Sequence, residues 1–383
     1  MRTFAGLSGQ TLRTLIAAIA CITVFDITLG LSFPLFSLIL EDRGYSSVVI
    51  GLVAACGPLG VLAAGPLIPA MVARFGSRRL ALTCCLLVAA DLLLFKVFES
   101  LYLWFPLRFL LGGMACVLFA VSESWIVRSA EGPYRGRITA IYASVLSGGF
   151  ALGPALLPFT GFRGWAPFII GAAIMIVAMI PIAYVQVEDR LAKGETPVSF
   201  FAFFPQAPIL LLGVGTYALL DAALLSFLPL YGISQGLSVD MSALALTVLV
   251  GGNFLLQFPI GWIGDHFPRR RVMLGCALLT VISSLLLPVV IGHWSMWPIL
   301  IVLGTCGFGI YTMAIAMLGE HFKGAALVAG TAAFATMWGV GGIIGPMLTG
   351  WSIALLGPHG FPLMMAFVFG LFSILLMARG LRQ

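Results

Sequence analysis

Residues 257–271 read QFPIGWIGDHFPRRR, and residues 65–79, which lie 192 positions earlier, read GPLIPAMVARFGSRR. Each stretch passes from an apolar segment through a turn into a cluster of arginines, a pattern typical of a short loop between two membrane spans. The same spacing aligns a motif of glycines and proline, namely Gly149, Gly153 and Pro154 with Gly341, Gly345 and Pro346. Since 192 is close to half of the 383 residues, the spacing indicates two copies of one unit.

The first apolar segment of each copy carries one aspartate ahead of a proline. Asp26 precedes Pro34 as Asp221 precedes Pro229, here with a spacing of 195. A deletion of three residues after the proline restores the spacing of 192. This alignment predicts that Asp26 and Asp221 occupy equivalent positions in the two copies.

The composition indicates a protein that is solvated by lipid. Hydrophobic residues make up 61% of the chain and charged residues only 9%, against roughly 25% charged residues in soluble domains. A spanning helix needs about 20 mostly apolar residues, and the apolar runs are continuous rather than alternating, which excludes a strand barrel. We therefore expect an all-α polytopic membrane protein with twelve spans. They are predicted at 13–40, 46–72, 80–98, 101–127, 138–160, 166–187, 207–232, 240–264, 272–291, 295–319, 327–350 and 361–378.

The polar segment 188–206 separates a half at 1–187 from a half at 207–383, and we expect it to be a cytoplasmic linker. Lys and Arg gather in the loops that would share its side, which predicts a multi-pass protein of the bacterial inner (plasma) membrane with both termini cytoplasmic. Anionic lipid accounts for the net charge of +6 without nucleic acid. The four histidines lack metal-ligand spacing, so we expect no metal, no cofactor and no enzyme activity.

Ionisable side chains inside spans are the candidates for chemistry, because each costs at least about 2.5 kcal/mol to insert. Asp26 and Asp221 lie midway along their spans and are predicted to bind protons or substrate from opposite halves. The alternative is that each caps a backbone kink before the following proline. Arg108 is predicted to act with them, or else to form a structural ion pair, and the role of Asp91 stays open.

Two further groups are predicted from their positions. Glu123 is expected to pair with Arg74 or Arg78 and its counterpart Glu320 with Arg269 or Arg270; with Asp265, these residues would form a cytoplasmic gate. The glycine and proline motif would let helices approach closely and bend. Cavity walls are expected from Asn253, Gln257, Tyr142, Tyr311 and Trp338.

These motifs, in this order, resemble the major facilitator superfamily of transporters along essentially the whole chain. In that family the loop between spans 2 and 3 reads G-x-x-x-D-R-x-G-R-[KR]. The second copy keeps Gly261, Asp265, Arg269 and Arg270 and departs at His266 and Pro268. The first copy keeps Arg74, Gly76, Arg78 and Arg79, and has Pro69 and Ala73 in place of the glycine and the acid.

Other motifs of the chain resemble those of particular branches of the family. Arg108 and Gly112 match the family's span-4 pattern R-x-x-x-G, and residues 149–154 match its span-5 antiporter pattern G-x-x-x-G-P. The Glu123-Ser124-Trp125 run and residues 311–320, YTMAIAMLGE, are similar to the YcaD-like branch. The resemblance implies twelve helices in two pseudo-symmetric halves, and drug/proton-antiporter-like chemistry in which the span-4 arginine takes part.

The chain is therefore predicted to be a monomeric secondary transporter that works by alternating access. Its expected activity is proton-coupled export of a small hydrophobic or cationic compound, since the expected cavity offers two acids, one arginine and many apolar groups. There is no Walker phosphate loop, so ATP is not the expected energy source. Proton-coupled import of a small nutrient is the alternative, and an integral membrane enzyme or a lipid flippase is an alternative of another class.

Overall fold

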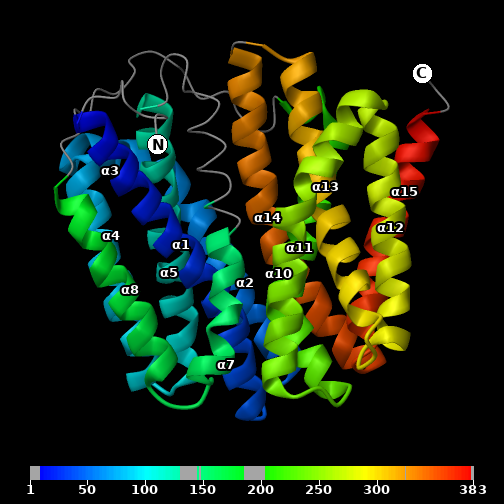
Figure 1. Cartoon of the computed structure of the whole chain (residues 1–383), viewed down its shortest axis with the longest axis horizontal. Coiled ribbons are helices and arrows are strands. Elements are labelled where there is room, and N and C mark those ends of the chain that lie inside the picture. Colours follow the sequence, from blue (N-terminus) through cyan, green and yellow to red (C-terminus); the bar gives the residue numbers. More distant parts are fainter. Residues whose placement is uncertain (1–8, 130–144, 146–147, 185–202, 324, 381–383) are drawn as a thin grey trace. The chain divides into compact units, whose positions relative to one another are not determined.

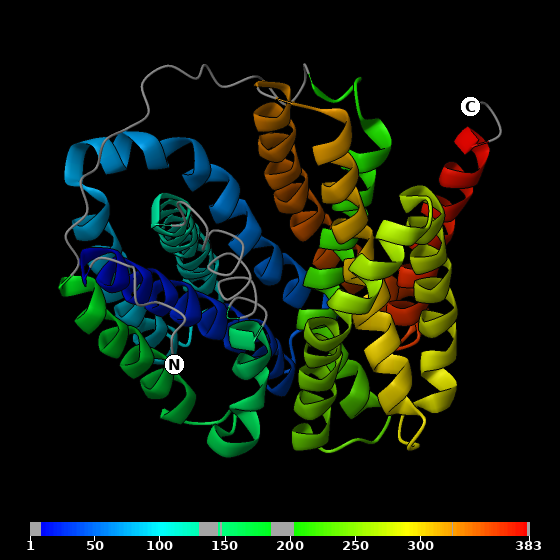
Figure 2. The same cartoon turned by 45° about the horizontal axis from the view of Figure 1, so that its top comes forward.

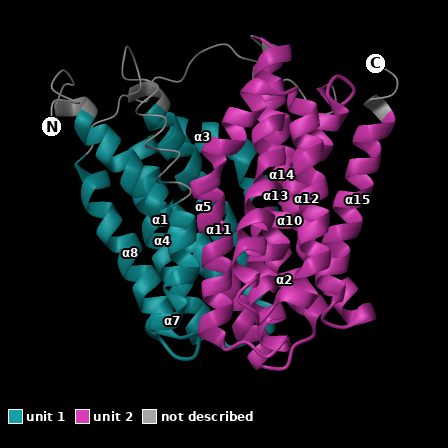
Figure 3. Ribbon diagram, turned by 45° about the vertical axis from the view of Figure 1, so that its right-hand side comes forward, with its two compact units in different colours: residues 1–32, 59–192 teal, residues 33–58, 193–383 magenta. Residues whose placement is uncertain are grey.

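The computed structural model describes residues 9–129, 145, 148–184, 203–323 and 325–380. Of residues 9–11, 127–129, 325, 328 and 379–380 it describes the backbone alone. The chain packs into two compact units, which Figure 3 shows in different colours. Unit 1 holds residues 1–32 and 59–192, and unit 2 holds residues 33–58 and 193–383.

The described residues are helical and contain no strand (Figure 1). Eleven of these helices are long and apolar enough to cross a membrane. The helices that begin in the first half are α1 (Gly9–Asp42), α2 (Ser47–Ala64), the 3₁₀ turn η1 (Gly65–Leu67), α3 (Ile68–Phe75), α4 (Ser77–Val97), α5 (Leu101–Ser129), α7 (Leu157–Thr160) and α8 (Ala166–Ala183). Those of the second half are α10 (Pro208–Ser234), α11 (Val239–His266), α12 (Arg269–Val290), α13 (Met296–His321), α14 (Ala325–Leu356) and α15 (Gly360–Gly380).

The second predicted span is broken near its end. Residues 65–67 tighten into η1 between α2 and α3, where Pro66 and Pro69 each lack the N–H that a continuous helix would use. The fifth predicted span, 138–160, lies partly outside the described residues, which show helix at 148–155 and α7 after it. The other predicted spans coincide with helices, so the all-α fold is confirmed and eleven of the twelve spans are found.

Unit 1 is organised around α4. This helix packs against α5 and against α8. The helical segment 148–155 lies against α1, because a Cβ at Gly153 would be only 2.3 Å from the backbone nitrogen of Leu31. Small residues thus bring these two backbones into direct contact.

Unit 2 repeats the same packing. Its helix α12 lies beside α13 and α15, as α4 lies beside α5 and α8, and α10 packs along α14 (Figure 2). The end of α1 and the start of α2 belong to this unit, where Ser47 Oγ donates a 2.9 Å hydrogen bond to the carbonyl oxygen of Gly350 in α14. Packing therefore groups residues 33–58 with unit 2, whereas the division at 188–206 follows the sequence repeat and stays a prediction.

One arginine hydrogen bond occurs at equivalent positions in both units. In unit 1, Arg78 of α4 donates to the carbonyl oxygen of Ala183 at the end of α8. In unit 2, Arg270 of α12 donates to the carbonyl oxygen of Leu376 in α15, at 2.8 Å. Arg78 and Arg270 are 192 positions apart. Each arginine ties the third helix of its copy to the sixth.

Candidate functional site

Asp26 is buried in unit 1 and has no hydrogen-bond partner among the described residues. Its side chain is 1% exposed, and neither carboxyl oxygen has a hydrogen-bond partner among the described residues. A Cβ at Gly149 would lie 3.0 Å from the Asp26 Cβ, so the glycine leaves just enough room for the aspartate. The kink-capping alternative is not observed, since Asp26 bonds to no described backbone group. An ionised carboxylate is very costly in such surroundings, whereas a protonated one is tolerated.

Arg108 lies in α5 of the same unit and binds other residues. It is 2% exposed, and its Nη1 donates a 2.8 Å hydrogen bond to Ser32 Oγ in α1. Its guanidinium also interacts electrostatically with Asp91 of α4, which is 3% exposed. One turn toward the α4–α5 loop, the rings of Phe95 and Trp104 meet edge to face at 5.3 Å. Asp91, whose role the sequence left open, is thus an acid that interacts with Arg108, although its Oδ2 has no hydrogen-bond partner among the described residues.

Asp221 is not the packing equivalent of Asp26. A Cβ at Gly341 would lie 2.8 Å from the Ala218 Cβ, as a Cβ at Gly149 would lie 3.0 Å from the Asp26 Cβ. Asp26 and Ala218 are separated by 192 positions, so the spacing of 192 holds here and Asp221 lies three residues further along α10. The predicted equivalence of the two aspartates is therefore wrong by nearly one turn.

The second glycine and the proline of each motif also differ in their contacts. Gly345 lies against Leu219, whereas Gly153 lies against Gly30 and Leu31, further along α1 than the spacing of 192 would place the contact. Pro154 and Pro346 lie within their helices. The two copies therefore share the first contact of the motif and diverge at the second.

In unit 2 a chain of hydrogen bonds joins α11 to α13. Thr312 Oγ1 donates to Gln257 Oε1 at 2.7 Å, and Gln257 Nε2 donates to Asn253 Oδ1. Gln257 Nε2 also lies 3.4 Å from the carbonyl oxygen of Thr305. Asn253, Gln257 and Thr312 are all half-buried. Of the predicted cavity residues, Asn253 and Gln257 are thus brought into one network.

Aromatic rings lie beside this network. Tyr217 of α10 packs on Phe308 and on Tyr311 of α13, with ring centroids 5.0 and 5.3 Å apart. Phe308 and Tyr311 are themselves 5.5 Å apart. Asp221 is one turn from Tyr217 on α10, close enough to interact with it electrostatically, and is partly exposed. We call Tyr217, Asp221, Asn253, Gln257, Thr305, Phe308, Tyr311 and Thr312 the α10–α11–α13 cluster.

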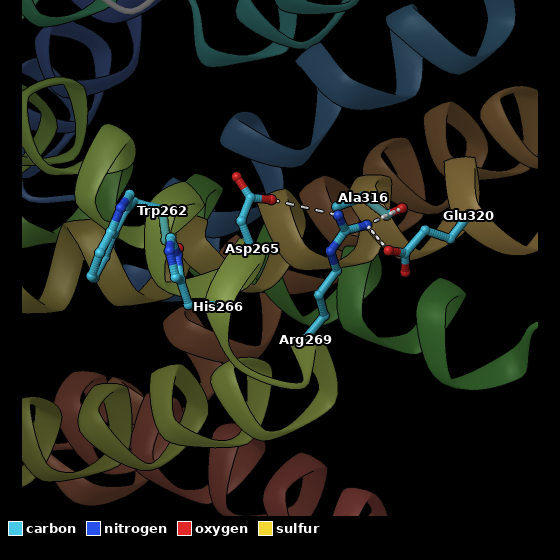
Figure 4. Close-up of polar contacts among 6 residues, drawn as sticks. All are labelled: Trp262, Asp265, His266, Arg269, Ala316 and Glu320. Carbon is cyan, nitrogen blue, oxygen red and sulfur yellow. Dashed lines mark hydrogen bonds and ion pairs between the residues drawn. The ribbon is translucent and has the colours of Figure 1, made fainter.

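A separate clamp joins the ends of α11, α12 and α13, as Figure 4 shows. Arg269 Nη1 forms a 2.8 Å ion pair with Glu320 and a 2.8 Å hydrogen bond to the carbonyl oxygen of Ala316. Its Nη2 lies 3.6 Å from Asp265 Oδ1. The expected Arg269–Glu320 contact is thus present, and it lies entirely within unit 2. Its role as a gate stays a prediction.

An open pocket of about 370 Å³ adjoins the clamp and is lined in part by Asp265, Arg269, Arg270 and Glu320. Both charge signs line it, so its walls do not select one class of ligand. Next to the clamp, His266 stacks on Trp262 with ring centroids 4.2 Å apart (Figure 4).

The remaining predicted residues are not joined into one site. Glu123 is exposed and forms no ion pair with Arg74 or Arg78 among the described residues; Arg74 instead lies over the ring of Phe75. Glu123 and Glu320 are not counterparts either, since they are 197 positions apart rather than 192. Trp338 is half-buried in α14, and Tyr142 lies outside the described residues.

The sequence patterns did not single out several residues of these clusters. Tyr217 precedes Asp221 by four residues, and Phe308 precedes Thr312 by four, so both share a helix face with a polar residue. That spacing was a usable signal. Ser32 carried none, because nothing in a single sequence marks one hydroxyl of an apolar span as the partner of Arg108.

The comparisons with known proteins agree on the family. The model for the Major Facilitator Superfamily matches residues 16–252 and 210–382. The uncharacterized MFS-type transporter YfkF of Bacillus subtilis is 26% identical over 337 residues, which cover 86% of each chain. The uncharacterized MFS-type transporter YcaD of Escherichia fergusonii is 25% identical over 304 residues, 78% of each chain.

Solved structures show the same fold. The nucleoside transporter NupG matches with a TM-score of 0.81 and 14% identity, over 97% of this chain and 99% of that one. A D-xylose-proton symporter matches with a TM-score of 0.71 and 16% identity, over 94% and 95%. Because the family model matches most of the chain, from residue 16 to residue 382, the chain belongs to the Major Facilitator Superfamily.

Proposed function

We propose that this secondary transporter couples the movement of its substrate to protons by alternating access, and that Asp26 is the residue that binds the proton. The observation that carries the proposal is the absence of any hydrogen-bond partner for either oxygen of Asp26 among the described residues. A buried carboxyl without hydrogen-bond partners favours its protonated form, so proton release from Asp26 would go with a change in its surroundings.

The neighbouring charges support the same assignment. Arg108 is occupied by Ser32 and by its interaction with Asp91, so it does not neutralise Asp26 in this structure. Release of the proton from Asp26 therefore requires water or a cation to reach it. Such access would follow from a change of conformation, and this links proton release to the opening of one side of the transporter.

For the substrate and direction, we propose export of a small hydrophobic or cationic compound by a monomer in the bacterial inner membrane, with both termini in the cytoplasm. The position of Asp221 beside Tyr217 in unit 2 supports a cationic substrate, because an acid next to aromatic rings suits a positively charged group. In each cycle a proton would bind Asp26 from outside and leave it to the cytoplasm, while the compound moves outward.

A second candidate is import of a small polar nutrient with protons. It is favoured by the hydrogen-bonded chain from Thr312 through Gln257 to Asn253, which would suit a solute with several polar groups. One structural relative is a proton symporter for D-xylose, so the fold supports either direction.

Everted membrane vesicles separate the two candidates. Respiration acidifies their lumen, and acridine orange reports loss of that acid when ethidium, tyramine, D-xylose or uridine is added. Proton-coupled export predicts loss of the gradient on adding a cation, whereas import predicts no loss in everted vesicles and proton uptake with D-xylose or uridine in right-side-out ones. Asp26→Asn should abolish the response, and Glu41→Gln, at the exposed end of the same helix, should keep it. A full response in Asp26→Asn would overturn the assignment.

A further inference from the structure

The hydrogen bonds of Gln257 determine which way its amide points. Its nitrogen faces the carbonyl oxygen of Thr305 at 3.4 Å, where the amide oxygen would be repelled. Its oxygen is then left to accept from Thr312, at 2.7 Å. Both ends of Gln257 form hydrogen bonds within the protein, so this residue orients its neighbours.

The orientation of Gln257 passes to Asn253. Because Gln257 donates to Asn253 Oδ1, the Asn253 amide must turn its NH₂ group the other way. Asn253 is half-buried, and these two donors form no hydrogen bond among the described residues. Nearby, Thr305 is 3% exposed and its Oγ1 has no hydrogen-bond partner among the described residues. A buried hydroxyl without a partner is costly, so the region beside Gln257 holds hydrogen-bonding capacity that the described residues leave unused.

Apolar walls and a negative charge complete the surroundings. Tyr217, Phe308 and Tyr311 present three rings in mutual contact. Asp221 follows one turn after Tyr217, at the level where α10 meets α13, since a Cβ at Gly307 would lie 2.4 Å from the Leu220 side chain. The α10–α11–α13 cluster contains no cationic side chain. It therefore offers flat apolar surface, one carboxylate and oriented amide donors.

We propose that the α10–α11–α13 cluster is the substrate site and that it takes a small aromatic amine carrying a hydrogen-bond acceptor. The ammonium group binds Asp221, the ring packs against Tyr217 and Tyr311, and the acceptor binds the Asn253 NH₂. Thr312 and Gln257 act as positioning residues for Asn253. The proposal rests on the proposed transport function, because it names the substrate class of that function.

A series of four compounds of similar size tests each contact. Tyramine has the ammonium, the ring and a phenolic hydroxyl. 4-Ethylphenol lacks the ammonium and phenethylamine lacks the hydroxyl, whereas 2-cyclohexylethylamine, which is compared with phenethylamine, also lacks the aromatic ring. Their Kd values can be measured by calorimetry on the detergent-purified full chain. We expect tyramine to bind most tightly and each deletion to weaken binding, by about tenfold for the ammonium.

The variants assign the contacts to residues. Asp221→Asn should remove the preference for tyramine over 4-ethylphenol. Thr312→Val should reduce the preference for tyramine over phenethylamine and leave the ammonium preference unchanged. Thr247→Val is the matched control, because Thr247 lies on α11 and bonds only within its own helix, to Ala243. It should bind like the parent.

Asp26→Asn separates this proposal from the proposed function. Calorimetry needs no proton gradient, so Asp26→Asn should bind tyramine like the parent even if coupling is lost. Absence of binding by all four compounds, equal binding of tyramine and 4-ethylphenol, or equal effects of Thr312→Val and Thr247→Val would overturn the site. Loss of coupling with binding intact would leave the site standing, and binding without any proton response in the parent would refute the proposed function alone.

Discussion

At the scale of the residue, the two buried acids of unit 1 have different surroundings. Asp91 interacts electrostatically with Arg108, whereas neither carboxyl oxygen of Asp26 has a hydrogen-bond partner among the described residues. The sequence shows both acids inside spans, which is why they were candidates. It also held a signal for the first pairing: Asp91 and Arg108 lie seven and eight residues from the loop that joins α4 to α5. In an antiparallel hairpin, that symmetry places them at the same depth.

The buried pair predicts a particular pattern of stability. Arg108→Gln should remove the cation near Asp91 and the charged donor to Ser32, and lower the free energy of unfolding by about 1.5–3 kcal/mol, the contribution of a hydrogen bond to a charged group. Asp91→Asn combined with Arg108→Gln should lose less than the sum of the single losses, because no lone charge remains. Thermal unfolding in detergent measures both effects. Additive losses would show that Asp91 and Arg108 do not interact.

At the scale of the element, span positions could be predicted and helix register could not. The predicted span 207–232 became α10 at Pro208–Ser234, because the apolar length of a helix is set by the bilayer it crosses. The equivalence of Asp26 and Asp221 failed because the alignment of the two helices depends on which atoms of the neighbouring helix each glycine touches. Gly341 faces Ala218, and no pattern in α10 alone records that contact.

Two glycines on one helix test the importance of that contact. Gly153→Ala would place a methyl 2.3 Å from the backbone nitrogen of Leu31, and should destabilise the protein by about 1–3 kcal/mol through forced separation of the helices. Gly148→Ala meets no described residue within 4 Å, and should be neutral or stabilise by up to about 1 kcal/mol through helix propensity. The melting temperatures of both variants decide this. A Gly153→Ala protein as stable as Gly148→Ala would mean that the helices part easily.

At the scale of the whole chain, the two units share packing and differ in chemistry. The Arg78 and Arg270 hydrogen bonds and the packing of α4 and α12 repeat. The buried acid of α1 does not, since Ala218 takes its place in unit 2. The repeated packing could therefore be predicted from the sequence. The loss of the acid could not, because it depends on a shift of three residues in the alignment of α1 with α10. The central claim is that unit 1 carries the proton and unit 2 binds the substrate.

Transport in proteoliposomes tests that claim most directly, with tyramine as the probe. Exchange of labelled for unlabelled tyramine without a pH gradient reports binding and movement, and accumulation driven by a pH gradient reports coupling. Asp26→Asn should keep exchange and lose accumulation, since an amide preserves the shape of the carboxyl and cannot bind and release its proton. Asp221→Asn should lose both. Accumulation at the parent level in Asp26→Asn would contradict the assignment of the proton to unit 1.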